Sequence, residues 1–469
     1  MTLQDTELTS GAPDPGEDPP APARPIRPGE PAGLRPLLLR LHFYAGLLVG
    51  PVVLVAAFTG LLYTVSPQIE QAVHGRELTV PAGAERIPLA EQVSIAQAAL
   101  PAGTLTEVRP AAVPDATTRV TFDTPGVRED YQRTVFVDPY TGGVRGTLDT
   151  FGEWLPARAW LDELHRTLLL GNVGRVYSEL AASWLWVLAL SGLVIWTVRR
   201  RRSSRLRRTL LPEVRSSGRR RLRSWHGAVG IWAFGGLLLL SATGLTWSQF
   251  AGENVGALRA ALNWSTPAVS STLPAAAGTG AAAAGTGAAD GATAQRMLEV
   301  ARGSGLDGPV EIRPPGDGGG AWAVQQAQRQ WPSKQDAVAI DPSTGRIVDR
   351  IDFADWPLAA KLTRWGIDTH MGLLFGVVNQ VLLAALALGI ICLVCWGYRM
   401  WWLRRPTRGW AGPPGSAMRP GPRAVLAVAV AALVLGVFLP VLGASLLAFL
   451  LVDSVVVRRQ PLPVDQAGG

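Results

Sequence analysis

Long apolar stretches alternate with polar ones along this chain, and their lengths predict its main elements. Four of them are long enough, at a helical rise of about 1.5 Å per residue, to cross the roughly 30 Å hydrocarbon core of a bilayer. We expect transmembrane helices at residues 35–65, 165–198, 225–250 and 369–398. A fifth apolar stretch, 424–457, contains Pro440 and is too long for one untilted helix, so we favour a helical hairpin over a single kinked span.

Two polar stretches between these helices, 66–164 and 251–368, predict small α+β modules. Helical spacing and strand-like alternation within them occur at residues 91–100, 119–122, 134–137 and 294–303. Each module also contains the turn sequence Asp-Pro-x-Thr-Gly, which begins at Asp138 and at Asp341. A stretch rich in Ala, Gly and Thr, 274–293, predicts a flexible linker inside the second module.

The two halves of the chain share sequence motifs. A histidine is followed by glycine four residues on and by Thr-Gly-Leu thirteen residues after that, in His42, Gly46, Thr59, Gly60 and Leu61 and in His226, Gly230, Thr243, Gly244 and Leu245. A second motif, His-x-x-Leu-Leu-x-Gly, begins at His165 and again at His370. We therefore expect two helix–module–helix units in the same orientation, related by an axis along the membrane normal.

Composition supports an α-helical integral membrane protein. Apolar residues make up 48% of the 469 residues, and the mean hydropathy is +0.19. The formal charge of +8 does not indicate nucleic-acid binding, because basic residues concentrate between the apolar stretches, at 199–224 and 399–423. The positive-inside rule places such loops in the cytoplasm, which makes both modules extracytoplasmic in a cytoplasmic membrane.

The ends of the chain and its cysteines add little to this arrangement. The Pro-rich residues 1–34 predict a disordered cytoplasmic tail, no cleavable signal peptide is visible, and residues 458–469 form a second tail. The two cysteines, Cys392 and Cys395, lie in one apolar stretch and form no disulfide framework. Small apolar packing explains them better than metal or redox chemistry.

Four of the five histidines recur at matched positions, and they are the main candidates for chemistry. An ionisable side chain in hydrocarbon is costly and is by default a functional hypothesis. We expect His42 to meet His226, and His165 to meet His370 near the extracytoplasmic face, each pair providing axial ligands for a haem iron. Gly46 and Gly230 would leave room for a macrocycle.

Other interpretations of the same residues stay open at this point. A single histidine at the end of a span is usually interfacial, and His74, which has no counterpart, is expected on the surface. Counting back from Arg199 places the membrane border near Glu179, so His165 would lie above the bilayer. Thr59 and Thr243 predict hydrogen-bonded kinks, with a role around a cofactor as an alternative. The arginines of 199–224 set topology, with contact to anionic lipid as a second role.

Residues 36–457 resemble the PepSY-associated transmembrane proteins, a group that includes iron-regulated membrane proteins and ferric-siderophore reductases. The resemblance rests on Leu41-His42, Thr59-Gly60-Leu61, Leu164-His165-Arg166, Leu168-Leu169-Leu170-Gly171, His226, Thr243-Gly244-Leu245-Thr246-Trp247, His370-Met371-Gly372, Phe375-Gly376, Asn379-Gln380 and Tyr398-Arg399-Met400-Trp401-Trp402. It implies that the two modules are PepSY-like. It also implies that His42, His165, His226 and His370 bind one or two non-covalent b haems.

The resemblance further implies a membrane ferric reductase that functions in iron uptake. Electrons would pass to ferric iron, as a siderophore or another ferric chelate, on the outer side. No dinucleotide-binding stretch is present, so the electron donor would be a separate molecule, and no residue beyond the haem ligands is expected to be catalytic. The alternative is a membrane-anchored PepSY protein that binds or regulates a partner without redox activity. A transporter is disfavoured, because we expect no buried charge in any span other than the histidine helices.

Overall fold

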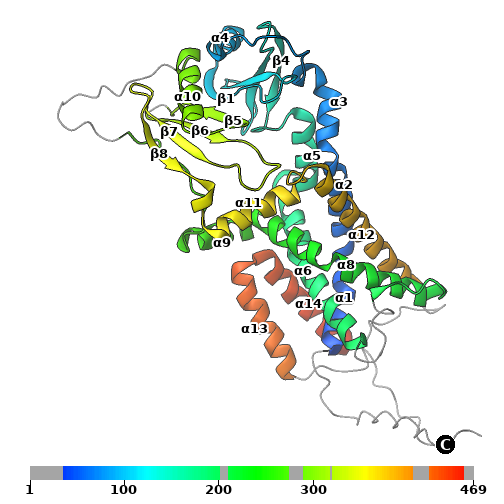
Figure 1. Ribbon diagram of the computed structural model, residues 1–469. Coiled ribbons are helices and arrows are strands. Elements are labelled where there is room, and N and C mark those ends of the chain that lie inside the picture. Colours follow the sequence, from blue (N-terminus) through cyan, green and yellow to red (C-terminus); the bar gives the residue numbers. More distant parts are fainter. Residues whose placement is uncertain (1–34, 201–209, 274–288, 317–318, 405–421, 459–469) are drawn as a thin grey trace, which may run out of the picture.

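The computed structural model describes residues 35–200, 210–273, 289–316, 319–404 and 422–458. They form a bundle of helices with a β-sheet layer at one end (Figure 1). The expected tails, most of the Ala/Gly linker and the middle of both basic loops lie outside the described residues.

Five helices make up the centre of the bundle. They are α1 (Arg35–Leu48), α2 (Gly50–Thr64), α6 (Gly171–Arg200), α8 (Gly218–Thr246) and α12 (Val377–Trp402). By length and composition α6, α8 and α12 are candidate membrane spans, and α1 with α2 makes a fourth if this pair, bent by 56°, is one span. Their packed surfaces share one apolar core that includes Val53, Trp184, Leu237 and Ile390.

The bend between α1 and α2 has a local cause. Pro51 has no N–H to donate to the carbonyl of Leu47 four residues earlier, which leaves that carbonyl without its helical partner. The hydroxyl of Tyr398 on α12 donates to Leu47 O at 2.5 Å. The broken turn is therefore stabilised by a neighbouring helix.

Two expected spans begin later than predicted, which corrects the ranges 165–198 and 369–398. His165 lies on a separate helix, α5 (Pro156–Thr167), and His370 ends another, α11 (Leu358–His370). Left-handed residues break the chain after each histidine, among them Leu168, Leu169 and Gly171 in one case and Gly372, Phe375 and Gly376 in the other. Such residues end a helix, so α6 and α12 start anew beyond them.

All eight strands belong to one antiparallel sheet. Its order is β4 (Val144–Thr150), β3 (Gln132–Val137), β2 (Thr118–Asp123), β1 (Thr104–Arg109), β5 (Val310–Arg313), β6 (Trp322–Gln326), β7 (Ala337–Ile340) and β8 (Ile347–Ile351). The two modules expected from the sequence meet where β1 pairs with β5, at Val108 and Ile312. The Asp-Pro-x-Thr-Gly turns connect β3 to β4 and β7 to β8, as predicted, with glycines at φ 73° and 71°.

Two helices, α4 (Leu89–Ala99) and α10 (Gly291–Gly303), cover one face of this sheet (Figure 1). Their apolar sides bury Val93 and Met297 against strand residues such as Phe122 and Trp322. A Cβ on Gly291 would lie 2.1 Å from the carbonyl oxygen of Ala90, so the close approach of the two helices requires glycine there. The opposite face of the sheet lies toward the bundle and is polar.

The remaining helices connect the layers or lie at the edge of the bundle. They are α3 (Ser66–Leu78) and α9 (Phe250–Ala261), with the 3-10 turn η1 (Phe353–Asp355) and the C-terminal α13 (Pro422–Phe438) and α14 (Pro440–Arg458). The last two form a hairpin that turns before Pro440 and packs closely at Gly436 and Gly443 (Figure 1). Arg40 on α1 pairs with Asp453 on α14 at 2.9 Å.

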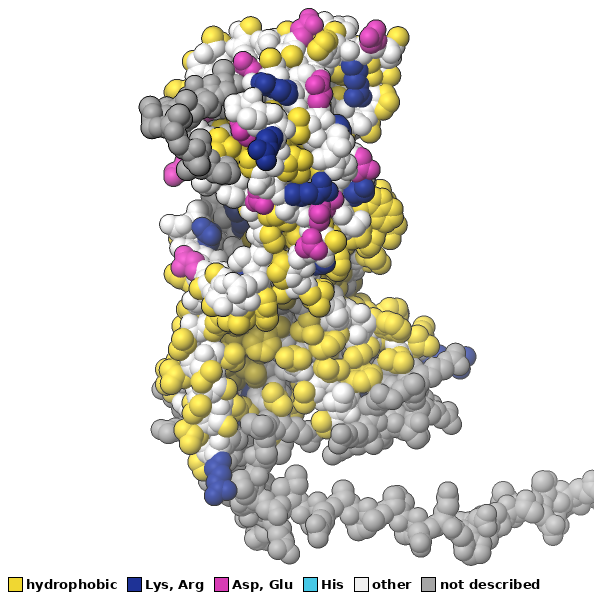
Figure 2. All heavy atoms as spheres, turned by 60° about the vertical axis from the view of Figure 1, so that its left-hand side comes forward, with side chains coloured by type: hydrophobic (Ala, Val, Ile, Leu, Met, Phe, Trp, Pro, Cys, Tyr) yellow, Lys and Arg dark blue, Asp and Glu magenta, His cyan; other side chains and the backbone are white. Residues whose placement is uncertain are grey.

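Hydrophobic side chains form a belt over the helices, whereas Lys, Arg, Asp and Glu side chains gather over the sheet layer (Figure 2). Exposed Leu and Val residues are abundant on α6, α12, α13 and α14, among them Leu382 and Leu433, and Trp232 is exposed on α8. An apolar surface of this extent is unstable in water and indicates contact with lipid.

Candidate functional site

The four matched histidines form two facing pairs. The ring centroids of His42 and His226 are 6.3 Å apart, and those of His165 and His370 are 6.5 Å apart. We name them the sheet-distal pair (His42 and His226) and the sheet-proximal pair (His165 and His370). Both combinations are those expected from the matched sequence positions.

In the sheet-distal pair, neighbouring helices fix the Nδ1 side of each ring. Nδ1 of His42 lies 2.9 Å from Oγ of Ser191, which itself donates to the carbonyl of Leu188. Nδ1 of His226 lies 3.1 Å from the carbonyl oxygen of Leu393 on α12. A carbonyl only accepts, so His226 carries its proton on Nδ1, and the Ser191 hydroxyl can accept a proton from Nδ1 of His42 while it donates to the carbonyl of Leu188.

The sheet-proximal pair is held in the same way by two threonines. Nδ1 of His165 lies 2.9 Å from Oγ1 of Thr59, and Nδ1 of His370 lies 2.5 Å from Oγ1 of Thr243. Each threonine hydroxyl also donates to a carbonyl one turn earlier in its own helix. Each threonine hydroxyl can therefore accept a proton from Nδ1 of its histidine while it donates to that carbonyl.

A proton on Nδ1 leaves the other ring nitrogen available. Within the described residues, no hydrogen bond reaches Nε2 of His42, His165, His226 or His370. A histidine that ligates a metal through Nε2 usually donates from Nδ1 to a protein oxygen, which orients the ring and raises its basicity. Two imidazoles bound to one metal at about 2 Å each would have centroids roughly 6 Å apart. Both pairs meet that geometry.

A cavity of about 390 Å³ surrounds the sheet-distal pair. Its lining is mostly apolar and includes Phe43, Leu188, Phe234 and Trp401. Glycines of five helices, α1, α2, α6, α8 and α12, also line it: Gly46, Gly50, Gly192, Gly227, Gly230 and Gly397. This volume lies within the range of small-molecule sites. The sequence predicted space at Gly46 and Gly230, and both line the cavity.

Two further glycines admit the imidazole rings themselves. A Cβ on Gly192 would lie 3.3 Å from Cε1 of His42, and a Cβ on Gly60 would lie 3.2 Å from Cε1 of His165. Each glycine directly follows the residue whose hydroxyl meets that histidine. In both cases, therefore, a residue with a hydroxyl group contacts Nδ1 of the imidazole, and the glycine after it leaves space for the ring.

The residues present fit haem. A bound haem would be held by the Nε2 atoms of the two histidines in each pair, and the cavity beside the sheet-distal pair is mostly apolar. The two pairs lie at different levels of the bundle. His226 and Thr243, which contacts His370, are seventeen residues apart on α8, which corresponds to about 25 Å along the helix.

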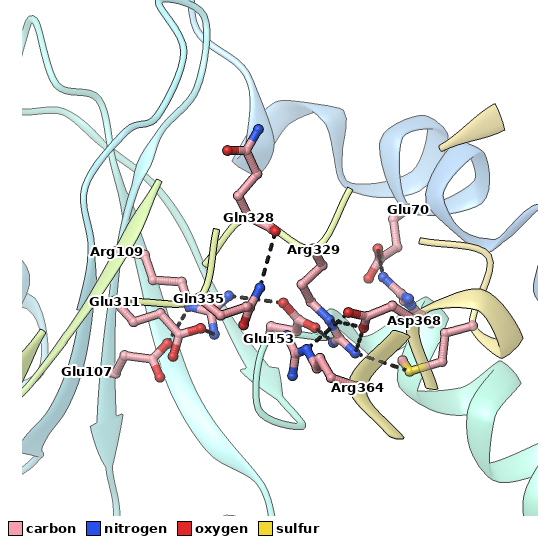
Figure 3. A network of polar contacts seen from close by, with 12 residues as sticks. Glu70, Glu107, Arg109, Glu153, Glu311, Gln328, Arg329, Gln335, Arg364 and Asp368 are labelled. Carbon is pink, nitrogen blue, oxygen red and sulfur yellow. Dashed lines mark hydrogen bonds and ion pairs between the residues drawn. The ribbon is translucent and has the colours of Figure 1, made fainter. Parts of the chain in front are cut away.

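A network of charged residues joins the sheet layer to α11, the helix that ends at His370 (Figure 3). Arg329, between β6 and β7, pairs with Glu153 beyond β4 and with Asp368 on α11, the latter at 2.7 Å. Asp368 also pairs with Arg364 at 3.0 Å, and its side chain is only 3% exposed. Because Asp368 lies two residues before His370, this network fixes α11, the helix that carries His370.

Arginines of the network offset the effect of burial on the pKa of Glu153. Burial alone would raise the pKa of Glu153, but the guanidinium groups of Arg329 and Arg109 outweigh it and hold the pKa at about 2. Burial would likewise lower the pKa of Arg329, and its carboxylate partners raise it instead. Glu153 and Arg329 are thus both ionised at neutral pH.

Sequence reasoning missed several of these groups. Ser191, Arg329 and the carbonyl of Leu393 have no recognisable motif. For Thr59 and Thr243 the sequence predicts hydrogen-bonded kinks, with a role around a cofactor as the alternative, and their equal spacing from His42 and His226 is a signal for their contacts with His165 and His370. His74 lies on α3, outside both pairs, and Cys392 and Cys395 are free thiols on α12.

Comparison with known proteins supports the family resemblance. The family model for the PepSY-associated TM region matches residues 39–404, which is most of the chain and includes all four paired histidines. The curated proteins contain no match. The chain therefore belongs to the family of membrane proteins with a PepSY-associated transmembrane region.

Proposed function

We propose that the protein is a haem-containing membrane reductase that passes electrons across the cytoplasmic membrane to ferric iron or a ferric siderophore on the outer side. The observation that carries the proposal is the pair of facing imidazoles, repeated at two levels, with every Nδ1 in contact with a protein oxygen and no hydrogen bond to any Nε2 among the described residues. Haem, when bound, supplies a one-electron carrier at each level.

The two levels suit transport of electrons through a bilayer. A single site would leave much of the roughly 30 Å hydrocarbon core to be crossed in one step, whereas sites about 25 Å apart along α8 divide it. The helices hold the rings in place and exclude water from the apolar cavity. On this proposal the chain is two duplicated units with the sheet layer outside, because arginines gather where α8 begins, at the opposite end.

The chemistry of iron explains why such a protein would need no hydrolytic group. Ferric iron in a tight oxygen-donor chelate is a hard ion, and reduction to the softer ferrous ion weakens the complex. One electron per iron therefore releases the metal while the chelator stays intact. The sheet-proximal pair lies nearest the outer face and would be the last carrier before the acceptor.

Optical spectroscopy of the purified full chain, expressed with added haem precursor, tests the proposal. We expect a Soret band and sharp reduced bands, a haem content near two per chain, and reoxidation of the dithionite-reduced protein by a ferric siderophore. His42→Ala and His370→Ala should each remove about half of the haem, and His74→Ala, outside both pairs, should remove none. A folded preparation that remains colourless would overturn the proposal.

A further inference from the structure

Three arginines line one end of the cavity around the sheet-distal pair. They are Arg219, Arg223 and Arg404. Arg223 and Arg219 precede His226 by three and seven residues, so they lie about one and two turns before it on the same side of α8. Arg404 follows the end of α12 by two residues. The rest of the lining is mostly apolar.

These positive charges are close together. Burial lowers the pKa of Arg404, and repulsion from Arg219 lowers it further, so these two side chains are near neighbours. Among the residues that the structure describes, no carboxylate pairs with Arg219 or Arg223. The nearby Glu213 pairs instead with Arg220, which does not line the cavity. Within the described part of the chain, the guanidinium groups of Arg219 and Arg223 therefore have no carboxylate partner.

The cavity is therefore shaped for an amphipathic ligand. Its interior would accept a flat apolar body between the two imidazoles, and its mouth would accept anionic groups on one edge of that body. Guanidinium binds carboxylate through parallel charge-assisted hydrogen bonds, which a lysine cannot reproduce.

We propose that Arg219, Arg223 and Arg404 bind the two propionate carboxylates of the haem held by His42 and His226, so that this edge of the macrocycle lies at the end of the bundle where α8 begins. The proposal rests on the proposed function, since it presumes haem at this pair. It assigns a cofactor-binding role to arginines whose place in a basic loop is otherwise explained by topology alone.

The arginines would also affect the redox balance of this site. Reduction lowers the positive charge on the iron by one unit, so nearby cations stabilise the reduced form and raise the midpoint potential. Loss of one arginine should therefore lower the potential of the sheet-distal haem. The sheet-proximal haem, about 25 Å away along α8, should be unaffected at physiological ionic strength, where the Debye length is about 8 Å.

The test compares Arg223→Gln and Arg219→Gln with the control Arg220→Gln in the full chain. The measurement is the rate at which each protein transfers haem b, or haem dimethyl ester, to excess apomyoglobin. Haem b should leave the protein in two phases, one for each pair of histidines. We expect each cavity variant to accelerate one of these phases about 3- to 10-fold, which is the effect expected from loss of a partly exposed charge pair. The control should match the wild type, and the esterified haem should dissociate quickly from all of them.

A spectroscopic redox titration supplies the second measurement. A fall in the midpoint potential of one haem, in the cavity variants only, supports the assignment. Equal dissociation of haem b and its dimethyl ester from the wild type would overturn it, because the carboxylates would then make no contact. The assignment would also be overturned if the cavity variants lost haem at the wild-type rate and the substitutions affected only how the stability of the protein depends on anionic lipid. Absence of a Soret band in the wild type would refute the proposed function itself.

Discussion

The link between the sheet layer and the bundle can be tested through Arg329, independently of any cofactor. Arg329→Met removes the charge and keeps the length of the side chain. Glu153 would keep Arg109, at 3.2 Å, and Asp368 would keep Arg364. Each carboxylate would therefore lose one of its two cationic partners.

The size of the effect follows from burial. Removing one partner of a buried ion pair typically costs 3–5 kcal/mol, because a charge is left without compensation. Asp368 is 3% exposed and Glu153 is 24% exposed, and each retains an arginine, so we expect about 2–3 kcal/mol. At about 1.4 kcal/mol per factor of ten, opening of α11 should become about 30- to 150-fold more frequent.

Amide hydrogen exchange followed by mass spectrometry measures this opening directly. Exchange should accelerate in α11 and in the segment between β6 and β7, and remain unchanged in the centre of α8. The matched control is Arg133→Met, whose exposed pair with Asp149 should contribute less than about 1 kcal/mol. If exchange in α11 is the same in Arg329→Met as in the control, the network does not fix this helix.

Three further predictions concern single groups. Thr243→Val removes the hydrogen-bond partner of His370 and should shift the spectrum and lower the occupancy of the sheet-proximal haem, whereas Thr243→Ser should restore both. Gly192→Ala places a methyl group 3.3 Å from the His42 ring, so haem content should fall by up to half while the helix content measured by circular dichroism is kept. Glu153 has its pKa depressed from 4.5 to about 2 in the folded state, so its stabilisation is fully present above pH 4.5 and is lost as pH falls toward 2. Acid unfolding of the sheet layer should show this window, and Glu153→Gln should reduce the slope within it.

The sequence predicted the pairing of the histidines because duplicated motifs place equivalent residues at equivalent depths. His42 with His226 and His165 with His370 follow from that relation alone. The helix starts could not be predicted in the same way. Leu168, Leu169 and Phe375 adopt left-handed conformations that such residues rarely occupy, and only tertiary contacts impose them.

The shared sheet was also beyond prediction. Each module contains four strands with ordinary patterning, and nothing in β1 or β5 distinguishes an edge strand from a paired one. Pairing between Val108 and Ile312 joins segments about two hundred residues apart. The ion pairs of Arg329 could not be predicted from the sequence either, because its partners come from the other half of the sheet and from α11. Contacts between distant segments depend on the assembled fold and leave no local signal.

If both pairs hold the same cofactor through the same ligands, any direction of electron flow must come from what surrounds them. The two sites differ in this respect. Among the described residues no carboxylate pairs with Arg219 or Arg223 at the mouth of the cavity, whereas Arg329 and Arg364 near His370 both pair with Asp368. The potential of the sheet-distal haem should therefore respond strongly to loss of an arginine, and that of the sheet-proximal haem should respond weakly to paired removal of Arg364 and Asp368. Equal shifts at both sites would mean that the surroundings do not set the difference, and the ligand geometry itself would have to do so.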